Sequence, residues 1–211
     1  MYEVPCGMFE IEVFADVVCP FTHVGLRRIV AEREARGRTD IKLRIRAWPL
    51  ELVNGKPMDP EFLRTEIEPL RASVTPDLFV GFNALTFPTT SMPAFALTAA
   101  AYRISPAAGE QVAMDLRTQL FEHGIDIGEA SVIKTIAARH RVPVPDIDSQ
   151  RQEIIEDWNA GKARGAIGSP HFFVRDEGFF CPTLNIQHDE TGFQISIDEI
   201  ELRKFFDSCF E

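Results

Sequence analysis

The sequence predicts an α/β fold in which the two ends of the chain form one core and a long helical segment is inserted between them. Residues 8–48 follow a strand, helix and strand pattern, residues 49–164 lack strand signals, and strand patterns return in residues 165–211. A short strand–helix–strand unit implies parallel pairing of its two strands. The core is therefore expected to combine an N-terminal βαβ unit with C-terminal strands and a closing helix.

The N-terminal unit begins with Phe9–Ala15, which becomes continuously apolar, as a central strand does. The next helix is expected from Pro20 to Arg36, because Gly37 is a typical helix stop. Residues 41–48 alternate strictly between apolar and polar side chains. This alternation predicts a strand with one solvated face, and its arginines are assigned to that face.

Proline positions divide the inserted segment into helices. Residues 61–70 form a predicted helix that kinks or ends before Pro69, and residues 74–90 form a predicted loop with a short helical turn. Further helices are expected at 93–103, 106–123, 128–140 and 148–164. The connections are short, so 49–164 is expected to be one compact helical subdomain rather than a free second domain.

The C-terminal part returns to short apolar stretches separated by turn residues. Strands are predicted at 171–175, 179–186 and 192–197. Pro182 marks an edge or a bend, because proline cannot donate to a sheet. Asp198–Phe210 is the predicted closing helix, with Cys209 on its apolar side.

Composition excludes several classes of protein. A net charge of −10 and a pI near 5.0 argue against a nucleic-acid-binding or membrane-surface protein. No apolar run has the length of a membrane span, and the N-terminus lacks the pattern of a secretory signal. The four cysteines, at 6, 19, 181 and 209, form no CxxC or zinc-like pair. A cytoplasmic, reduced protein without a metal is therefore expected.

Cys19 lies at the junction of the first strand and the first helix. Pro20 suits the first helical turn, where a missing N–H costs nothing. A thiol at this position meets unpaired N–H groups and the positive end of the helix dipole, and both favour the nucleophilic thiolate. The sequence therefore predicts a Cys19 pKa below that of a free cysteine. A buried, inert cysteine at the end of a strand is the alternative.

A second motif, Gly168-Ser169-Pro170, places a proline immediately before an apolar strand. Cys-Pro at a strand–helix junction, followed much later by Gly-x-Pro and a strand, resembles the thioredoxin fold. The long helical segment between the motifs resembles the DsbA-like branch of that fold, and specifically its FrnE-like group. The resemblance covers the chain from about Phe9 to its C-terminus.

The FrnE-like group carries Cys-Pro-x-Cys followed by a large aromatic residue and a nearby glycine. This chain keeps Cys19, Pro20 and Gly25. Thr22 replaces the second cysteine, and His23 replaces the aromatic residue. The resemblance therefore implies the fold and the position of the site, while Thr22 puts the usual dithiol chemistry in doubt.

The resemblance also implies how a substrate is held. The Ser169–Pro170 bond is expected to be cis, with Pro170 against the sulfur of Cys19. Ser169 would then present backbone groups to a bound thiol or peptide. Pro20 and Phe21, next to Cys19, are expected to contact the same substrate.

Thr22 and His23 each leave two interpretations open. Thr22 follows Cys19 by three residues and faces the same side of the helix start, so its hydroxyl either donates to the Cys19 thiolate or satisfies a backbone group. His23 follows by four residues. It either contacts Cys19 and a substrate or packs as a replacement for the aromatic residue, and packing is favoured.

Thr22 decides the functional prediction, because a CxxC enzyme resolves a mixed disulfide with its second cysteine. We expect a DsbA/FrnE-like thiol–disulfide oxidoreductase that acts through the single thiol of Cys19. Its partners are a low-molecular-weight thiol or a protein thiol or disulfide, and the small thiol is a co-substrate rather than a tightly bound cofactor. Cys181 and Cys209 remain alternatives for the resolving thiol.

Two other functions stay open. Kappa-class glutathione transferases and hydroxychromene-carboxylate isomerases are related branches with Ser-Pro-x-Ser at this junction. Thr22 leans toward them and Cys19 departs from them. A redox-inactive binding module is the third possibility. Phenylalanines between 79 and 87 predict either a substrate groove or the interface of a homodimer.

Overall fold

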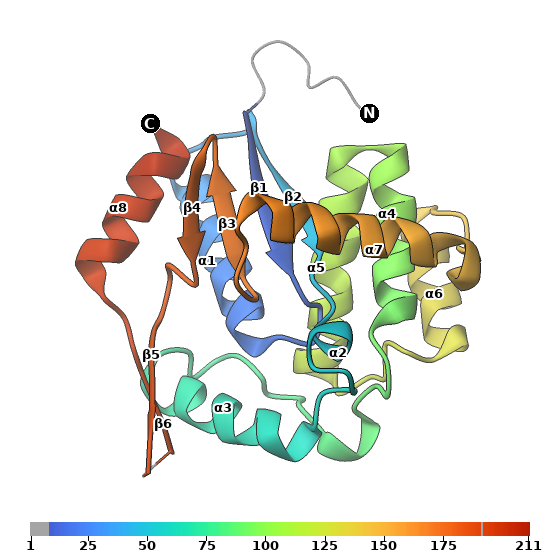
Figure 1. The fold of residues 1–211 in the computed structure, drawn as a ribbon, viewed down its shortest axis with the longest axis horizontal. Coiled ribbons are helices and arrows are strands. Elements are labelled where there is room, and N and C mark those ends of the chain that lie inside the picture. The colour runs from blue at the N-terminus through green and yellow to red at the C-terminus, as the bar shows by residue number, and fades with distance from the viewer. Residues whose placement is uncertain (1–8, 191) are drawn as a thin grey trace.

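The computed structural model describes residues 9–190 and 192–211, and Cys6 lies outside the described residues (Figure 1). The central sheet has the strand order β2–β1–β3–β4. Its strands are β1 (Phe9–Ala15), β2 (Ile41–Ala47), β3 (His171–Val174) and β4 (Glu177–Phe180). β1 and β2 are parallel, as predicted, whereas β3 is antiparallel to β1 and β4 is antiparallel to β3.

Helices surround this sheet, and a separate antiparallel hairpin follows β4 (Figure 1). The helices are α1 (Pro20–Ala35), α2 (Leu50–Val53), α3 (Pro60–Ser73), η1 (Ala84–Thr86, a 3-10 turn), α4 (Met92–Ile104), α5 (Pro106–His123), α6 (Ala130–His140), α7 (Ile147–Arg164) and α8 (Glu199–Phe210). The hairpin consists of β5 (Asn185–Asp189) and β6 (Gly192–Ser196). No helix in the described residues combines the length and apolar character that a membrane span requires.

The two faces of the sheet bury different helices because successive side chains of β1 point in opposite directions. Ile11 and Val13 pack in one cluster with α1 and α8, where Phe205 contributes the largest side chain. Phe14 points to the other face and packs with Trp48 beside α7. α7 approaches closely there, since a Cβ on Gly161 would lie 2.7 Å from the Phe14 ring.

The outer edge of β2 is covered by side chains from the inserted helices. The N–H of Leu43 donates to Glu110 of α5 at 3.0 Å, and that of Ile45 donates to the Tyr102 hydroxyl of α4 at 2.8 Å. The N–H of Ala47 donates to Asp157 of α7 at 3.1 Å. Alternate donors of this edge strand are therefore satisfied by side chains instead of by another strand.

The arginine-bearing face of β2 is not the solvated face that the alternation predicted. Arg46 forms ion pairs with Glu12 at 3.0 Å and with Asp157 at 2.6 Å. The Arg44 guanidinium stacks over the Tyr102 ring at 4.4 Å. The prediction was wrong because α7 lies over this face and supplies carboxylates to the half-buried arginines.

The inserted helices share their buried residues with the sheet ends. One cluster joins Val18 and Val24 of the N-terminal unit to Leu63 and Ile67 of α3, and it also contains Ile195 of β6. The division at residues 49 and 164 stays a prediction from the sequence. Packing across it places α3 and the β5–β6 hairpin next to the start of α1 (Figure 1).

Two predicted boundaries were wrong. α3 continues through Pro69 to Ser73, because Leu63, Ile67 and Leu70 hold its buried face in the core. The predicted strand 179–186 is divided between two sheets. Cys181 has a φ of 45°, in the left-handed region, and this turn separates β4 from the hairpin.

Candidate active site

Cys19 is the N-cap residue of α1, and its extended backbone has φ −80° and ψ 118°. Pro20 opens the helix, and the N–H of His23 donates to the Cys19 carbonyl at 3.2 Å. The Cys19 side chain is only 3% exposed. The sequence therefore placed Cys19 correctly at the helix start, in a more buried position than a surface nucleophile.

The cis-proline loop, Gly168–Pro170, meets Cys19 at the end of the sheet. β3 runs antiparallel to β1, with His171 opposite Phe14, so residues before β3 lie beside residues after β1. The Ser169–Pro170 peptide bond is cis. The thiol of Cys19 donates to the Ser169 carbonyl at 3.2 Å. The two sequence motifs thus form one site.

Two hydroxyl groups lie next to the sulfur. Thr22 Oγ1 and Ser169 Oγ form a hydrogen bond of 2.9 Å. Ser169 Oγ also accepts the backbone N–H of Asp16 at 2.8 Å. Hydrogen bonds from both hydroxyls and from the Thr22 N–H act to lower the pKa of the Cys19 thiol. Thr22 therefore belongs to the site rather than only to the helix backbone.

Burial outweighs these hydrogen bonds and raises the pKa of Cys19 to about 11. A buried thiolate loses its hydration, which disfavours the charged form. A negative charge on Glu66 raises the pKa further. The predicted lowering of the Cys19 pKa was wrong because the sequence reveals the helix start and not the depth of burial.

Asp16 holds the turn that carries Cys19, and sequence reasoning missed it. Its fully buried carboxylate accepts the N–H of Val18 at 3.0 Å and the N–H of Leu50 at 2.5 Å. Burial raises the pKa of Asp16 to about 6. The available signal was an acidic residue directly after an apolar strand, three residues before Cys19.

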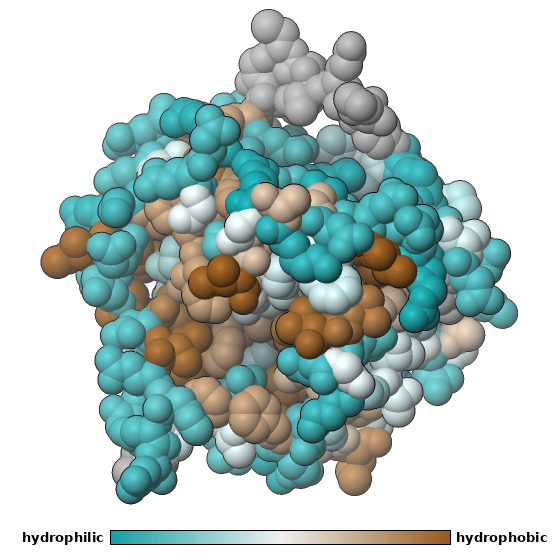
Figure 2. Space-filling model, in the orientation of Figure 1, coloured by the Kyte–Doolittle hydropathy of each residue, from teal (hydrophilic) through white to brown (hydrophobic). Residues whose placement is uncertain are grey.

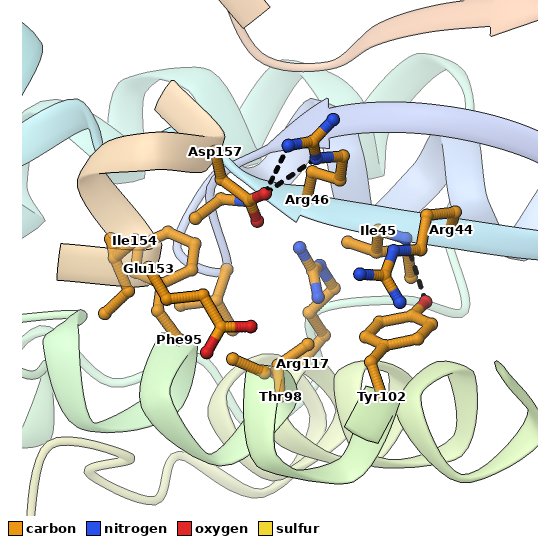
Figure 3. Close-up of a pocket in the computed structure, with 13 residues that line it drawn as sticks. Arg44, Ile45, Arg46, Phe95, Thr98, Tyr102, Arg117, Glu153, Ile154 and Asp157 are labelled. Carbon is orange, nitrogen blue, oxygen red and sulfur yellow. Dashed lines mark hydrogen bonds and ion pairs between the residues drawn. The ribbon is translucent and has the colours of Figure 1, made fainter. Parts of the chain in front are cut away.

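Arg117 of α5 supports the same turn. Its guanidinium is buried and donates to the Asp16 carbonyl at 3.1 Å and to the Ala113 carbonyl at 2.8 Å. Figure 3 shows Arg117 with Arg44 and Arg46 around a small cavity between β2, α4 and α7. The cavity has a volume of about 20 Å³, which holds little more than one water molecule. Arg117 therefore has a supporting role behind Cys19.

His23 has a packing role. Its ring is fully buried between Phe79, at 5.3 Å, and Phe121, at 5.0 Å, and Nε2 lies 2.7 Å from Glu122. The structure therefore removes it from the surface that a substrate would touch. Phe79 and Phe87 are buried as well, so the expected exposed phenylalanine groove or interface at 79–87 is not present.

The surface around the cis-proline loop is apolar. Pro20 and Pro170 are buried, while Phe21 and Ser169 are partly exposed. Ile167 is 72% exposed and Phe180 is 51% exposed, and neither was identified from the sequence. A Cβ on Gly168 would lie 2.6 Å from the Phe180 ring, so this ring lies over the loop. Figure 2 shows apolar side chains gathered around the ends of β3 and β4 and beside α2.

The other two described cysteines occupy different positions. The N–H of Cys181 donates to the Pro170 carbonyl at 3.0 Å, and its buried thiol feels the charge of Cys19. Cys209 packs in the cluster of α1 and α8. All three described cysteines are free thiols. Within residues 9–190 and 192–211, no three His, Cys, Asp or Glu side chains gather as a metal site.

Comparison with known proteins supports the same reading of the fold. The model of the DSBA-like thioredoxin domain family matches residues 10–188. The solved structure of cytosolic disulfide reductase DsbM from Pseudomonas aeruginosa with GSH is 15% identical, with a TM-score of 0.59 over 95% of this chain and 98% of that chain. 2-Hydroxychromene-2-carboxylate isomerase is 13% identical, with a TM-score of 0.59 over 81% and 88%. No curated protein sequence matches. At these identities the likeness to solved structures shows the fold.

Proposed function

Because this chain belongs to the family of DSBA-like thioredoxin domains, we propose that it is a thiol–disulfide oxidoreductase that acts through the single thiol of Cys19. The observation that carries the proposal is the position of Sγ, at the start of α1 and 3.2 Å from the carbonyl of the cis-proline loop. Thr22 occupies the third position after Cys19, so the proposed chemistry is that of a monothiol. We place the chain with the FrnE-like group on its motif.

The proposed reaction is exchange through a mixed disulfide. The Cys19 sulfur attacks one sulfur of a substrate disulfide, a Cys19–substrate disulfide forms, and the other substrate sulfur leaves with the electron pair and takes up a proton. A second thiol then attacks the mixed disulfide and releases Cys19. The substrate disulfide is reduced at the expense of two thiols, and Cys19 returns unchanged.

The surroundings of Cys19 support a polypeptide as well as a small thiol as substrate. Exposed Ile167 and Phe180 form an apolar border beside the cis-proline loop, and Phe21 borders Cys19 on the other side of the sequence motif. Free cysteines suit a reducing compartment, and we therefore propose a cytoplasmic location, with a small thiol of that compartment as co-substrate.

The direct test is the intact mass of the protein after incubation with glutathione disulfide. We expect one glutathionyl group on the wild type and none on Cys19→Ser. Cys181→Ser should carry the same adduct for the same time as the wild type, because burial makes the Cys181 thiol a weak nucleophile. Absence of an adduct on the wild type would reject the proposal. A longer-lived adduct on Cys181→Ser would instead make Cys181 the resolving thiol.

A second candidate function is a glutathione-dependent isomerase or transferase. The observation that favours it is the Cys19 pKa of about 11, which keeps this thiol protonated at neutral pH. Cys19, Thr22 and Ser169 would then act as hydrogen-bond donors to the thiolate of a bound small thiol. Cys19→Ala separates the two functions, since it abolishes mixed-disulfide formation but preserves most of a conjugation or isomerisation that relies on the two hydroxyls.

A further inference from the structure

Glu66 is a buried carboxyl group without a partner. It lies on the buried face of α3, between the apolar side chains of Leu63, Ile67 and Leu70, and is only 8% exposed. It forms no hydrogen bond or ion pair with the rest of the described chain. Burial of an unpaired carboxylate is costly, so such a group is retained where its ionisation is used.

The buried face of α3 is directed at the start of α1. Leu63 and Ile67, on either side of Glu66, pack in one cluster with Val18, the residue before Cys19, and with Val24. Glu66 and Cys19 also interact electrostatically, since a charge on Glu66 acts on the thiol. The carboxyl group is therefore held beside the proposed nucleophile by packing from both helices.

The elements packed against α3 bring few other titratable groups. β6 and η1 contain no titratable side chain, and in α1 the nearest, His23, is paired with Glu122. Cys181, in the same cluster, is a buried thiol. The only resolved influence on the Glu66 pKa is burial, which raises it to about 7. Cys19 is therefore the group with which Glu66 can exchange a proton.

Asp16, the other buried carboxyl group near Cys19, is not free for this task. Both of its oxygens accept backbone N–H groups, from Val18 and from Leu50. A change in its protonation would disturb the turn that carries the thiol. Glu66 has no such duty, so its proton can move without breaking a hydrogen bond.

We propose that Glu66 and Cys19 share one proton and act as a thiol–carboxyl pair in the exchange reaction, an inference that rests on the proposed function. The Glu66 carboxylate takes the proton of the Cys19 thiol as the sulfur attacks a disulfide. The new bond joins Cys19 to one substrate sulfur, and the broken bond releases the other as a thiolate. Glu66 returns its proton to that thiolate, and the pair again carries one negative charge.

One shared charge resolves the difficulty that burial creates for Cys19. Two negative charges in this apolar site would repel each other, so the pair loses its two protons in separate steps. After the first step the charge is distributed between the carboxylate and the thiolate. A fraction of Cys19 is therefore thiolate at neutral pH even though its second-step ionisation lies far higher.

The test is the rate of Cys19 alkylation by iodoacetamide, measured against pH by intact mass. Alkylation follows the thiolate and does not require disulfide exchange. We expect two rises in the wild type, the first near pH 7, and a single rise in Glu66→Gln. Glu68→Gln is the matched control, because Glu68 lies on the exposed side of the same helix, and it should keep both rises.

A second readout is the exchange rate with glutathione disulfide at neutral pH, which Glu66→Gln should lower by about 10- to 100-fold, the range of general acid–base catalysis at its lower end. Removal of a negative charge without proton transfer would have the opposite effect, because it lowers the Cys19 pKa. A single rise in the wild type, two rises in Glu66→Gln, or faster exchange in that variant would overturn the proposal. A wild type that shows two rises but forms no adduct would reject the exchange function and leave the thiol–carboxyl coupling in place.

Discussion

The hydroxyl oxygens of Thr22 and Ser169 lie 2.9 Å apart, although 147 positions separate them in the sequence. Pairing of β1 with β3 brings the residues after one strand beside the residues before the other. The Asp16 N–H, which donates to Ser169 Oγ, fixes this hydroxyl from a third direction. The position that holds a second cysteine in the Cys-Pro-x-Cys motif is therefore bonded here to the cis-proline loop.

Replacement of Thr22 by cysteine should create a dithiol enzyme. Thr22→Cys places a thiol three residues after Cys19 in the first turn of α1, on the same side of the helix, where a disulfide can form. The new thiol can attack a mixed disulfide on Cys19 and release the partner. We expect a several-fold faster turnover than that of the wild type in an insulin-reduction assay.

The double variant Thr22→Cys with Cys19→Ser is the control for this gain, and it should be inactive. A variant that forms its disulfide without a gain in turnover would show that the site is not arranged for exchange. The isomerase or transferase function would then be favoured. A wild type that equals the variant would point to another resolving thiol, with Cys181 first.

Removal of the Ser169 hydroxyl should affect both stability and reactivity. In Ser169→Ala the Asp16 N–H loses its acceptor, which should lower the free energy of unfolding by about 1–3 kcal/mol. The pKa of Cys19 should rise, because a hydroxyl that donates to the thiolate is lost. Chemical denaturation and the alkylation rate at constant pH measure the two effects. Ser131→Ala, on the exposed side of α6, should change neither.

Glu66 should make the stability of the protein depend on pH. Its folded-state pKa of about 7 lies above the usual 4.5, so the folded state holds the proton more tightly than the unfolded state. The stability that the protonated group provides is complete below pH 4.5 and is lost as pH rises through 7. The unfolding free energy of Glu66→Gln should therefore gain about 3 kcal/mol relative to the wild type across this range. Urea unfolding at several pH values measures it, and a constant difference would contradict it.

The hydroxyl of Tyr102 should stabilise the edge of the sheet. It accepts the Ile45 N–H at 2.8 Å and donates to the Leu43 carbonyl at 2.9 Å. Tyr102→Phe keeps the ring but leaves both buried backbone groups unpaired, so the free energy of unfolding should fall by about 1–3 kcal/mol. Thermal and urea unfolding test this. Unchanged stability would mean that water replaces the hydroxyl.

The sequence predicted most of the fold because its signals are local. The apolar run of β1, the alternation of β2 and the proline before each inserted helix identify elements from neighbouring residues alone. The DsbA-like assignment rested on Cys19-Pro20 and Ser169-Pro170, and the family match over residues 10–188 confirms it. Pro69 was misjudged because packing of Leu70 and Ile67 overrides a local helix breaker.

The parts of the site that escaped prediction depend on contacts between distant residues. Asp16 and Glu66 look like ordinary acidic residues in the sequence, and only the packing of Leu50 and α3 makes them buried. The Cys19 pKa was wrong in direction for the same reason, since burial is a property of the whole fold. Ile167 and Phe180 border the site only because β4 folds back on β3.

The covered edge of β2 has a consequence for how the chain folds during synthesis. β1, α1 and β2 leave the ribosome first, but the side chains that satisfy the outer edge of β2 come from Tyr102, Glu110 and Asp157. Until those helices are made, the nascent βαβ unit exposes an open strand edge, which is a template for pairing with another chain. The inserted helices therefore serve the N-terminal unit as a delayed internal chaperone, and truncation before Asp157 should leave a fragment prone to aggregation.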